Sequence, residues 1–241
     1  MITNEGSGTN IHEIADGIYR INTPVSLPGA GQFNFNQYLI QDDEPMLFHT
    51  GLRQMFPLVR EAIGHVLPVE TLRYLAFSHF EADECGALND FLAVAPKAEP
   101  VCSQVAALVS VGDFADRTPR PLADGEELSL GRRTVRWFDT PHTPHAWECG
   151  LMTESSTRTL FCGDLFTQAG SSNPPITESD ILGPSEAFRH AMDYFSHAKN
   201  AGALLEKLAS TKPTTLGCMH GSAWRGDGAK LLRSLADALT A

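Results

Sequence analysis

The stretch SHFEADECGAL, residues 78–88, gathers one imidazole and three carboxylates into six consecutive positions. The four side chains are those of His79, Glu81, Asp83 and Glu84. The apolar run YLAF at 74–77 comes directly before this stretch and is typical of a buried strand. The small and apolar residues that end the stretch suit the start of a helix. The charges therefore lie where a core strand ends.

These charges allow two interpretations. Charged groups at the end of a core strand cost free energy unless a partner compensates them. A metal ion does so, because imidazole and carboxylate are common metal ligands. The alternative is a solvated acidic turn, in which Asp and Glu complement the dipole of the helix that follows.

Three further apolar runs also end in side chains that can bind a metal. The candidates are His142 and His145 in the sequence DTPHTPH, then Asp164, and finally His220. Any one of these histidines is more often structural than a ligand. Four polar strand ends in one chain, however, are typical of a site built from loops on a rigid scaffold. We therefore expect a metal centre where these ends meet.

The composition limits the class of protein. The chain has 241 residues and 42% hydrophobic content with no low-complexity or charge-rich linker, so we expect one domain over residues 1–241. A net charge of -11 argues against nucleic acid and anionic membranes as partners, because both require a basic surface. No stretch resembles the apolar core of a signal peptide or a transmembrane helix. These features predict a cytoplasmic protein.

The five cysteines are odd in number and form no Cys-x-x-Cys pair. A disulfide framework and a structural zinc site are therefore not expected. Cys85, Cys149 and Cys218 lie near the candidate ligands in the sequence, and we expect buried free thiols at these positions.

Strand and helix patterns alternate along the chain, with hairpins near the start and in the middle. The run NQYLI at 36–40 predicts a strand, the segment 55–66 predicts a helix, and the segment 127–138 predicts a hairpin. This alternation predicts an α+β fold in which two mixed β-sheets pack together with helices on the outside. Such a fold is a four-layer αββα sandwich.

The order and spacing of the candidate ligands resemble those of the metallo-β-lactamase superfamily. Within it, the di-iron branch of flavodiiron proteins has a pattern similar to His-x-Glu-x-Asp-His-x-Gly, followed by His, Asp and His. The matching positions here are His79, Glu81, Asp83, Gly86, His142, Asp164 and His220. The resemblance covers nearly the whole chain and implies the metallo-β-lactamase fold.

The resemblance also implies a centre of two metal ions with divided ligands. The ligands of the first ion would be His79, Glu81 and His142, those of the second Asp83 and His220, and the bridge Asp164. We expect catalytic roles for the bridging Asp164 and for Glu84.

Three features depart from the family pattern. Glu84 stands where the family has a histidine, so the second ion either gains a carboxylate or loses a ligand. His49, in front of Thr50-Gly51, replaces a customary aspartate that supports a ligand. The chain leaves no room for the flavodoxin domain of flavodiiron proteins, so we expect no flavin bound within it. It resembles a stand-alone oxygen-binding di-iron protein.

The charges of the candidate ligands favour iron. Glu81, Asp83, Glu84 and Asp164 would supply four negative charges, which neutralise a diferrous pair. A diferric pair would keep two positive charges, which a bridging oxo, hydroxo or O2-derived ligand offsets. Oxygen ligands favour iron or manganese, whereas a His-rich site suits zinc. We therefore expect two Fe ions, with Zn or Mn as the alternatives.

Four other residues are candidates for roles around the ions. His145 lies three residues after His142 and could contact a bound ligand, orient a carboxylate or only cap a loop. His49 could orient a metal ligand. Phe80 and Trp147 could form an apolar shell that limits water access, although generic packing explains them equally well.

Three functions are compatible with this sequence. The first is a non-haem di-iron protein that binds dioxygen, or reduces O2 or NO with electrons from a separate donor protein. The second is a metal-dependent hydrolase of a thioester, lactone or phosphoester, against which Glu81 and Glu84 argue because its second site would be rich in histidine. The third is a non-catalytic metal-binding module. The resemblance further implies a homodimer, and the net charge of -11 predicts no nucleic acid or membrane as a partner.

Overall fold

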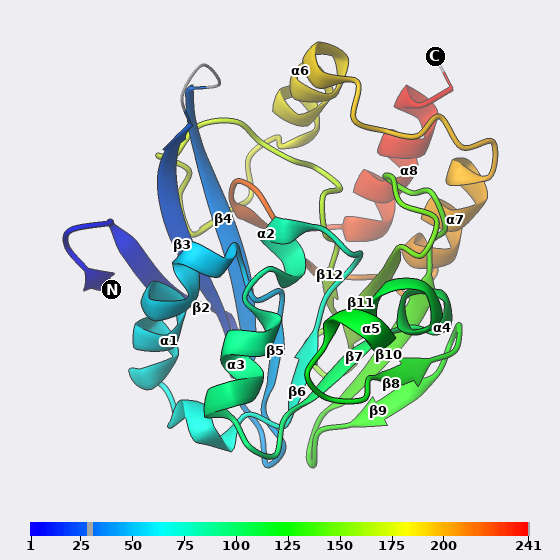
Figure 1. The fold of residues 1–241 in the computed structure, drawn as a ribbon. Coiled ribbons are helices and arrows are strands. Elements are labelled where there is room, and N and C mark those ends of the chain that lie inside the picture. The colour runs from blue at the N-terminus through cyan, green and yellow to red at the C-terminus, as the bar shows by residue number, and fades with distance from the viewer. Residues whose placement is uncertain (28–30, 241) are drawn as a thin grey trace.

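The computed structural model describes residues 1–27 and 31–240, which form two face-to-face β-sheets with helices on their outer faces (Figure 1). The first sheet is built from residues 2–122 and the second from residues 127–225, so each half of the chain forms one sheet. The predicted arrangement of two mixed sheets with helices outside is confirmed.

In the described part of the chain, the first sheet has eight strands in the order of the sequence. Strands β1 to β5 pair antiparallel, whereas β5 to β8 pair parallel. The strands are β1 (Ile2–Asn4), β2 (Thr9–Ala15), β3 (Ile18–Leu27), β4 (Gly31–Ile40), β5 (Met46–Phe48), β6 (Tyr74–Ala76), β7 (Glu99–Ser103) and β8 (Arg120–Leu122).

Seven strands of the described residues form the second sheet, in the order β13-β15-β14-β12-β11-β10-β9. The pairs β12–β14 and β13–β15 are parallel, and the others are antiparallel. The strands are β9 (Glu127–Ser129), β10 (Thr134–Asp139), β11 (Gly150–Glu154), β12 (Thr159–Phe161), β13 (Ile176–Thr177), β14 (Thr215–Gly217) and β15 (Ala223–Arg225).

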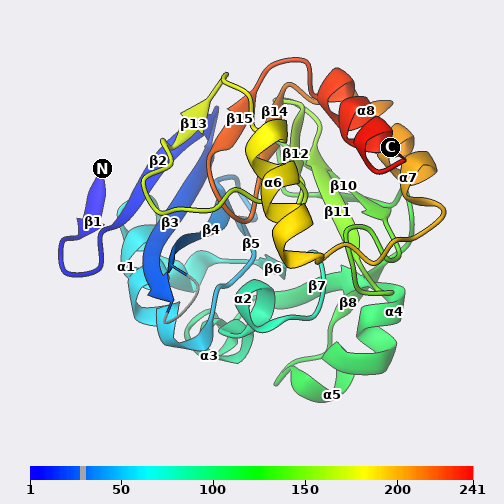
Figure 2. The same ribbon diagram turned by 90° about the horizontal axis from the view of Figure 1, so that it is seen from above.

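Helices cover both outer faces, with α1 and α3 beside the first sheet and α7 and α8 beside the second (Figures 1 and 2). The helices are α1 (Phe56–Gly64), α2 (Ala82–Cys85), α3 (Leu88–Val94), α4 (Gln104–Ala106), α5 (Gly112–Phe114), α6 (Leu182–Met192), α7 (Ala201–Ala209) and α8 (Gly228–Ala238). Short 3-10 helices are η1 (Arg53–Met55) and η2 (Val69–Thr71), and η3 (Ala107–Val111) is a π-helix. None of the helices in the described part of the chain has both the length and the apolar character needed to cross a membrane.

Three apolar cores hold the four layers together. The first lies between α1, α3 and the first sheet and includes Phe91. The second lies between the two sheets and includes Trp137, and the third joins the second sheet to α7 and α8 and includes Leu232. Each of these three side chains is fully buried. Burial of one such side chain stabilises a fold by about 1.5–3 kcal/mol, so the three cores fix the positions of the sheets.

Two segments have structures that their local sequence patterns do not reveal. The polar start of the chain forms β1 and β2, in which Thr9, Ile11 and Ile14 are buried against the core and the others are not. The alternation is weak because one of the inward positions is a threonine. The segment 103–114 is divided among α4, η3 and α5 rather than forming one regular helix.

The ends of several strands converge at one edge of the molecule. The acidic stretch follows β6, Asp164 follows β12, and His220 follows β14. Strands β12 and β14 are adjacent and parallel, so their carboxyl ends lie at the same edge. Loops at such ends carry the chemistry in many proteins that contain parallel strands. The candidate ligands therefore come from both sheets.

Candidate metal centre

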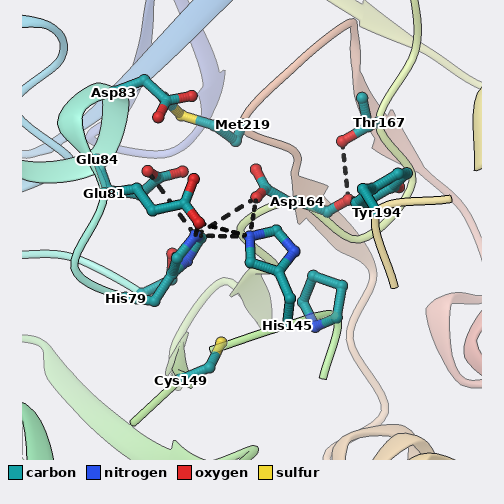
Figure 3. A network of polar contacts seen from close by, with 12 residues as sticks. His79, Glu81, Asp83, Glu84, His145, Cys149, Asp164, Thr167, Tyr194 and Met219 are labelled. Carbon is teal, nitrogen blue, oxygen red and sulfur yellow. Dashed lines mark hydrogen bonds and ion pairs between the residues drawn. The ribbon is translucent and has the colours of Figure 1, made fainter. Parts of the chain in front are cut away.

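Four side chains bring donor atoms together at this edge and make up what we call the first donor group (Figure 3). They are His79, Glu81, His145 and Asp164. The Nε2 atom of His79 lies 3.0 Å from Nε2 of His145 and 3.6 Å from both Glu81 Oε1 and Asp164 Oδ2. The same atom of His145 lies 3.1 Å from Glu81 Oε1 and 3.4 Å from Asp164 Oδ2. Ligands at about 2.1 Å from a tetrahedral ion are about 3.4 Å apart, so this spacing fits a metal.

His142 lies outside this group, which corrects the ligand assignment made from the sequence. Its side chain is exposed and its backbone φ is +63°. The loop closes on itself, because the backbone N–H of His142 donates to the carbonyl of Ala146 at 2.8 Å. This turn leaves His142 in solvent and presents His145 to the donor atoms. The geometry therefore gives His145 the place that the sequence analysis gave to His142.

A second donor group lies beside the first and consists of Asp83, Asp164 and His220. The Nε2 atom of His220 lies 3.4 Å from Asp83 Oδ2 and 3.4 Å from Asp164 Oδ1. Its other ring nitrogen, Nδ1, lies 2.8 Å from the carbonyl oxygen of Asn34. Because a carbonyl only accepts, Nδ1 carries a proton, and Nε2 is the atom left for a metal.

Asp164 belongs to both groups. Its Oδ2 faces His79 and His145, whereas its Oδ1 faces His220. Within the described residues, the buried Oδ1 has no hydrogen-bond partner. A carboxylate with its two oxygens directed at different donor groups has the geometry of a bridge between two ions.

Glu84 is fully buried, and neither of its oxygens has a hydrogen-bond partner among the described residues. Its Oε2 lies 3.9 Å from Nε2 of His79. Burial, followed by the negative charge of Asp164, raises the pKa of Glu84 well above its usual value. A buried carboxylate without a partner is costly, and an adjacent cation removes that cost. The buried carboxylate of Glu84, with no partner among the described residues, is therefore the feature that best fits a metal ion at this edge.

The charges around the two donor groups shift the pKa values of their carboxylates and imidazoles in opposite directions. Hydrogen bonds from His145 and His79 lower the pKa of Glu81 to about 2. Burial lowers the pKa of His220, but the adjacent carboxylates of Asp164 and Asp83 outweigh it and raise the value to about 9. Both shifts follow from opposite charges that lie close together. Four carboxylates and three histidines meet here, a donor set that fits two cations.

The residues expected around the ligands lie in different environments. His49 is buried, and its Nε2 lies 3.0 Å from the hydroxyl of Ser78, next to the ligand candidates. Phe80 is half-buried and meets the ring of Phe114 edge-on at a centroid distance of 5.1 Å. Trp147 is 55% exposed, so its side chain does not fit the predicted shell that excludes water. All five cysteines are buried and free, as expected for Cys85, Cys149 and Cys218.

Tyr194 is a further residue beside the donor groups that the sequence does not predict. Its hydroxyl donates to the backbone carbonyl of Asp164 at 3.1 Å, and its ring lies 6.1 Å from that of His145. Burial raises the pKa of this hydroxyl, so it stays protonated. Tyr194 follows α6 and is 30 residues beyond Asp164, and no local pattern in that loop indicates a contact with the ligands.

A family model described as ODP family beta lactamase matches residues 33–221. The chain is 27% identical to the putative diflavin flavoprotein A 1 of Thermosynechococcus vestitus, over 76% of this chain and 32% of the relative. It is 26% identical to the rubredoxin-oxygen oxidoreductase of Megalodesulfovibrio gigas, over 80% of this chain and 49% of the relative. It is 23% identical to the anaerobic nitric oxide reductase flavorubredoxin of Pectobacterium atrosepticum, over 83% of this chain and 40% of the relative.

Solved structures show the same fold. The flavodiiron protein from Giardia intestinalis superposes with a TM-score of 0.79 at 19% identity, covering 96% of this chain and 59% of that chain. Fragment 1–254 of the putative diflavin flavoprotein A 5 from Nostoc sp. also gives 0.79 at 18% identity, covering 96% and 94%. This chain spans a third to a half of the curated relatives that it matches.

Proposed function

This chain belongs to the family described as ODP family beta lactamase, and from that premise we propose that its metal centre is a non-haem di-iron site that binds dioxygen. We extend the proposal to reduction of O2 or NO when an external donor supplies electrons. The observation that carries it is the shared donor set, in which Asp164 faces both groups and the buried Glu84 has no partner among the described residues. Such oxygen-rich ligands suit iron.

The names of two relatives support the choice of O2 and NO. One is a rubredoxin-oxygen oxidoreductase and the other an anaerobic nitric oxide reductase flavorubredoxin. This chain matches only 49% and 40% of those proteins.

Two irons, when bound, would supply electrons to a small ligand such as O2 or NO. The residues that would hold them divide into His79, Glu81 and His145 for one ion, Asp83, Glu84 and His220 for the other, and Asp164 for both. Phe33 and Phe35 pack on the ring of His220 at centroid distances of 4.4 and 5.2 Å. These rings keep water away from one side of the second donor group.

The other side of the centre is open. The side chains of Glu81 and His145 are 49% and 20% exposed, which leaves a path for a small molecule. This opening supports a reactive site over a closed metal-binding module. The hydrolase alternative is not favoured, because Glu81 and Glu84 place carboxylates among donor atoms that would be rich in histidine in a zinc hydrolase.

The remaining proposals concern partners and organisation. We propose a donor of electrons outside residues 1–241, a homodimer as the working state, and a location in the cytoplasm. We also propose that residues 1–241 unfold as one unit. Size-exclusion chromatography with light scattering tests the dimer. A single unfolding transition, with metal and without it, is the result expected if residues 1–241 unfold as one unit.

Metal analysis with oxygen exposure is the decisive test. Protein from iron-replete cells, purified without chelators, is analysed for metal, reduced without oxygen and then exposed to O2 or NO under optical monitoring. We expect about two irons per chain and an optical change on addition of either gas. Two zincs with no optical response would contradict the proposal, and hydrolysis of esters and lactones by that form would establish the alternative.

A further inference from the structure

His49 occupies a strained position behind the metal centre. It follows β5, its side chain is only 1% exposed, and its backbone φ is +65°. The left-handed conformation costs a residue with a side chain about 1–3 kcal/mol, and it persists only where the surroundings fix it. The backbone N–H of His49 donates to the carbonyl of Ala76 at 2.7 Å, which holds β5 and β6 together at this point.

Both ring nitrogens of His49 contact residues that directly precede candidate ligands. Nε2 lies 3.0 Å from the hydroxyl of Ser78, and that hydroxyl lies 3.0 Å from Nδ1 of His79. Nδ1 of His49 lies 2.9 Å from the sulfur of Met219, which directly precedes His220. One side chain therefore connects the end of β6 with the end of β14.

The direction of these hydrogen bonds follows from His79. Its Nε2 faces the first donor group, so its Nδ1 carries the proton and donates to Ser78. The Ser78 hydroxyl then donates to the free electron pair on Nε2 of His49. The proton of His49 is on Nδ1 and points at the sulfur of Met219, a weak acceptor. Every donor has an acceptor only when His49 is neutral.

The hydroxyl of Ser78 is buried and closely packed, with His49 and His79 as its side-chain partners. Ser78 is 2% exposed, and its carbonyl accepts from the N–H of Gly150 at 2.8 Å. Gly163 has a φ of +50°, and a Cβ at this position would lie 3.1 Å from the Ser78 hydroxyl oxygen. Only glycine fits there without strain. Protein groups rather than water therefore decide where the hydroxyl points.

We propose that His49 is a positioning residue that sets the electron-donating strength of His79 through Ser78, an inference that rests on the proposed di-iron function. A carboxylate that accepts from a ligating imidazole makes that imidazole more basic. A hydroxyl that donates its own hydrogen bond to a neutral imidazole increases the basicity of the ligating imidazole less than a carboxylate does. A weaker donor stabilises the oxidised ion less. His49 thus keeps the reduction potential of the nearer ion higher than an acidic residue at this position would.

Variants at position 49 test this inference by their reduction potentials. His49→Gln keeps an acceptor for Ser78, His49→Asp supplies a charged one, and His65→Gln is the control on an exposed histidine. We expect His49→Asp to change the ratio of oxidised- to reduced-state binding constants at least tenfold, a fall of about 59 mV for a one-electron step. His49→Gln and His65→Gln should stay within threefold. In a Ser78→Ala background, the effect of His49→Asp should fall by more than half.

The potential of His49→Asp would overturn the inference if it equalled that of the parent protein, or if its shift were the same without the Ser78 hydroxyl. If His49→Asp does not fold, zinc affinities of His49→Gln and His49→Leu decide instead. His49→Gln should retain the zinc affinity of the parent protein, and His49→Leu should bind zinc at least tenfold more weakly. Equal affinities would overturn the inference.

A second readout separates this inference from the proposed function. Imidazole ¹⁵N NMR of the zinc-loaded protein reports which nitrogen of each histidine carries the proton. We expect Nδ1–H for both His49 and His79. Absence of iron binding or of an O2 response would refute the function while leaving this spectrum informative. A doubly protonated His49, or one with its proton on Nε2, would overturn the positioning role.

Discussion

Among the residues that the structure describes, two glutamates are fully buried, yet their surroundings differ completely. Glu154, at the end of β11, accepts hydrogen bonds from the backbone N–H and the hydroxyl of both Ser156 and Thr157. Glu84, in α2, accepts none from the described residues. The β11–β12 turn satisfies its own carboxylate, whereas α2 leaves its carboxylate without a hydrogen-bond partner among the described residues. Burial alone therefore does not distinguish a structural glutamate from a ligand, but the number of protein partners does.

The pKa shifts of the two glutamates reflect the same difference. Burial raises the pKa of Glu154, but hydrogen bonds from Ser156 and Thr157 outweigh it, and the net shift is downward. Burial and the charge of Asp164 raise the pKa of Glu84 well above its usual value. In the metal-free protein the first carboxylate stabilises the fold as an anion, and the second destabilises it.

Removal of Asp164 should give the largest effect, because this side chain faces both donor groups. Asp164→Ala should reduce the metal content from about two ions per chain to less than about half an ion. Asp113→Ala, at an exposed aspartate of α5, is the matched control and should retain the full content. Elemental analysis after dialysis measures both. A full complement in Asp164→Ala would show that a carboxyl oxygen without a protein partner does not indicate a ligand here.

Two histidines of one loop extend the comparison. His145→Ala should lower the affinity of the first donor group at least about 100-fold, because a ligand is lost. His142→Ala should leave affinity unchanged, because this side chain is exposed. Competition with a chromogenic chelator measures both constants. A larger loss in His142→Ala than in His145→Ala would restore the assignment made from the sequence.

Neutral replacements of the two glutamates should act in opposite directions on the metal-free protein. Glu84→Gln should raise the free energy of unfolding by about 1–3 kcal/mol, because an unsatisfied buried charge is removed. Glu154→Gln should lower it by a similar amount, about 1–3 kcal/mol, because the amide nitrogen cannot accept hydrogen bonds. Urea unfolding in the presence of chelator measures both.

Metal binding provides the control for this pair. Glu84→Gln should weaken the binding of the second ion only, and Glu154→Gln should change the binding of neither ion. Equal destabilisation by the two replacements would mean that Glu84 has partners in the folded chain.

The smallest effects should appear in the pH dependence of stability. The pKa of Glu84 is raised in the folded protein. The contribution of this side chain to stability is therefore fully present below its usual pKa of 4.5 and is lost as the pH rises. Because the pKa of Glu154 is lowered, its contribution is present above 4.5 and is lost as the pH falls. The difference between parent and Glu84→Gln should therefore grow from pH 4 to pH 8. The difference for Glu154→Gln should shrink from pH 5 downward, and parallel curves would contradict both assignments.

The layers of the fold could be predicted because periodicity is a local property. Alternating strand and helix patterns sufficed for two mixed sheets with helices outside. The strands β1 and β2 were missed because their inward positions include Thr9, so the apolar alternation is incomplete. Their place in the sheet depends on pairing with β3, which no local pattern encodes.

The candidate site could be predicted only in part for a related reason. His79, Glu81 and Asp83 lie within one short stretch, so their spacing alone brings them together. The choice between His142 and His145 depends on a turn closed by one backbone hydrogen bond, and spacing does not reveal it. The link from His49 through Ser78 depends on β5 and β6 lying side by side, and Tyr194 arrives from a distant loop.

The division of the chain between the two sheets also has a mechanical consequence. The acidic stretch that follows β6 belongs to the first half of the chain, and His145, Asp164 and His220 belong to the second. Bound ions would therefore act as a cross-link between the halves, in addition to the apolar core that joins them. A cut in the largely exposed segment 123–126 would yield two fragments, each with an incomplete set of ligands. Metal would then drive their reassembly, since an ion that binds only the joined form stabilises it.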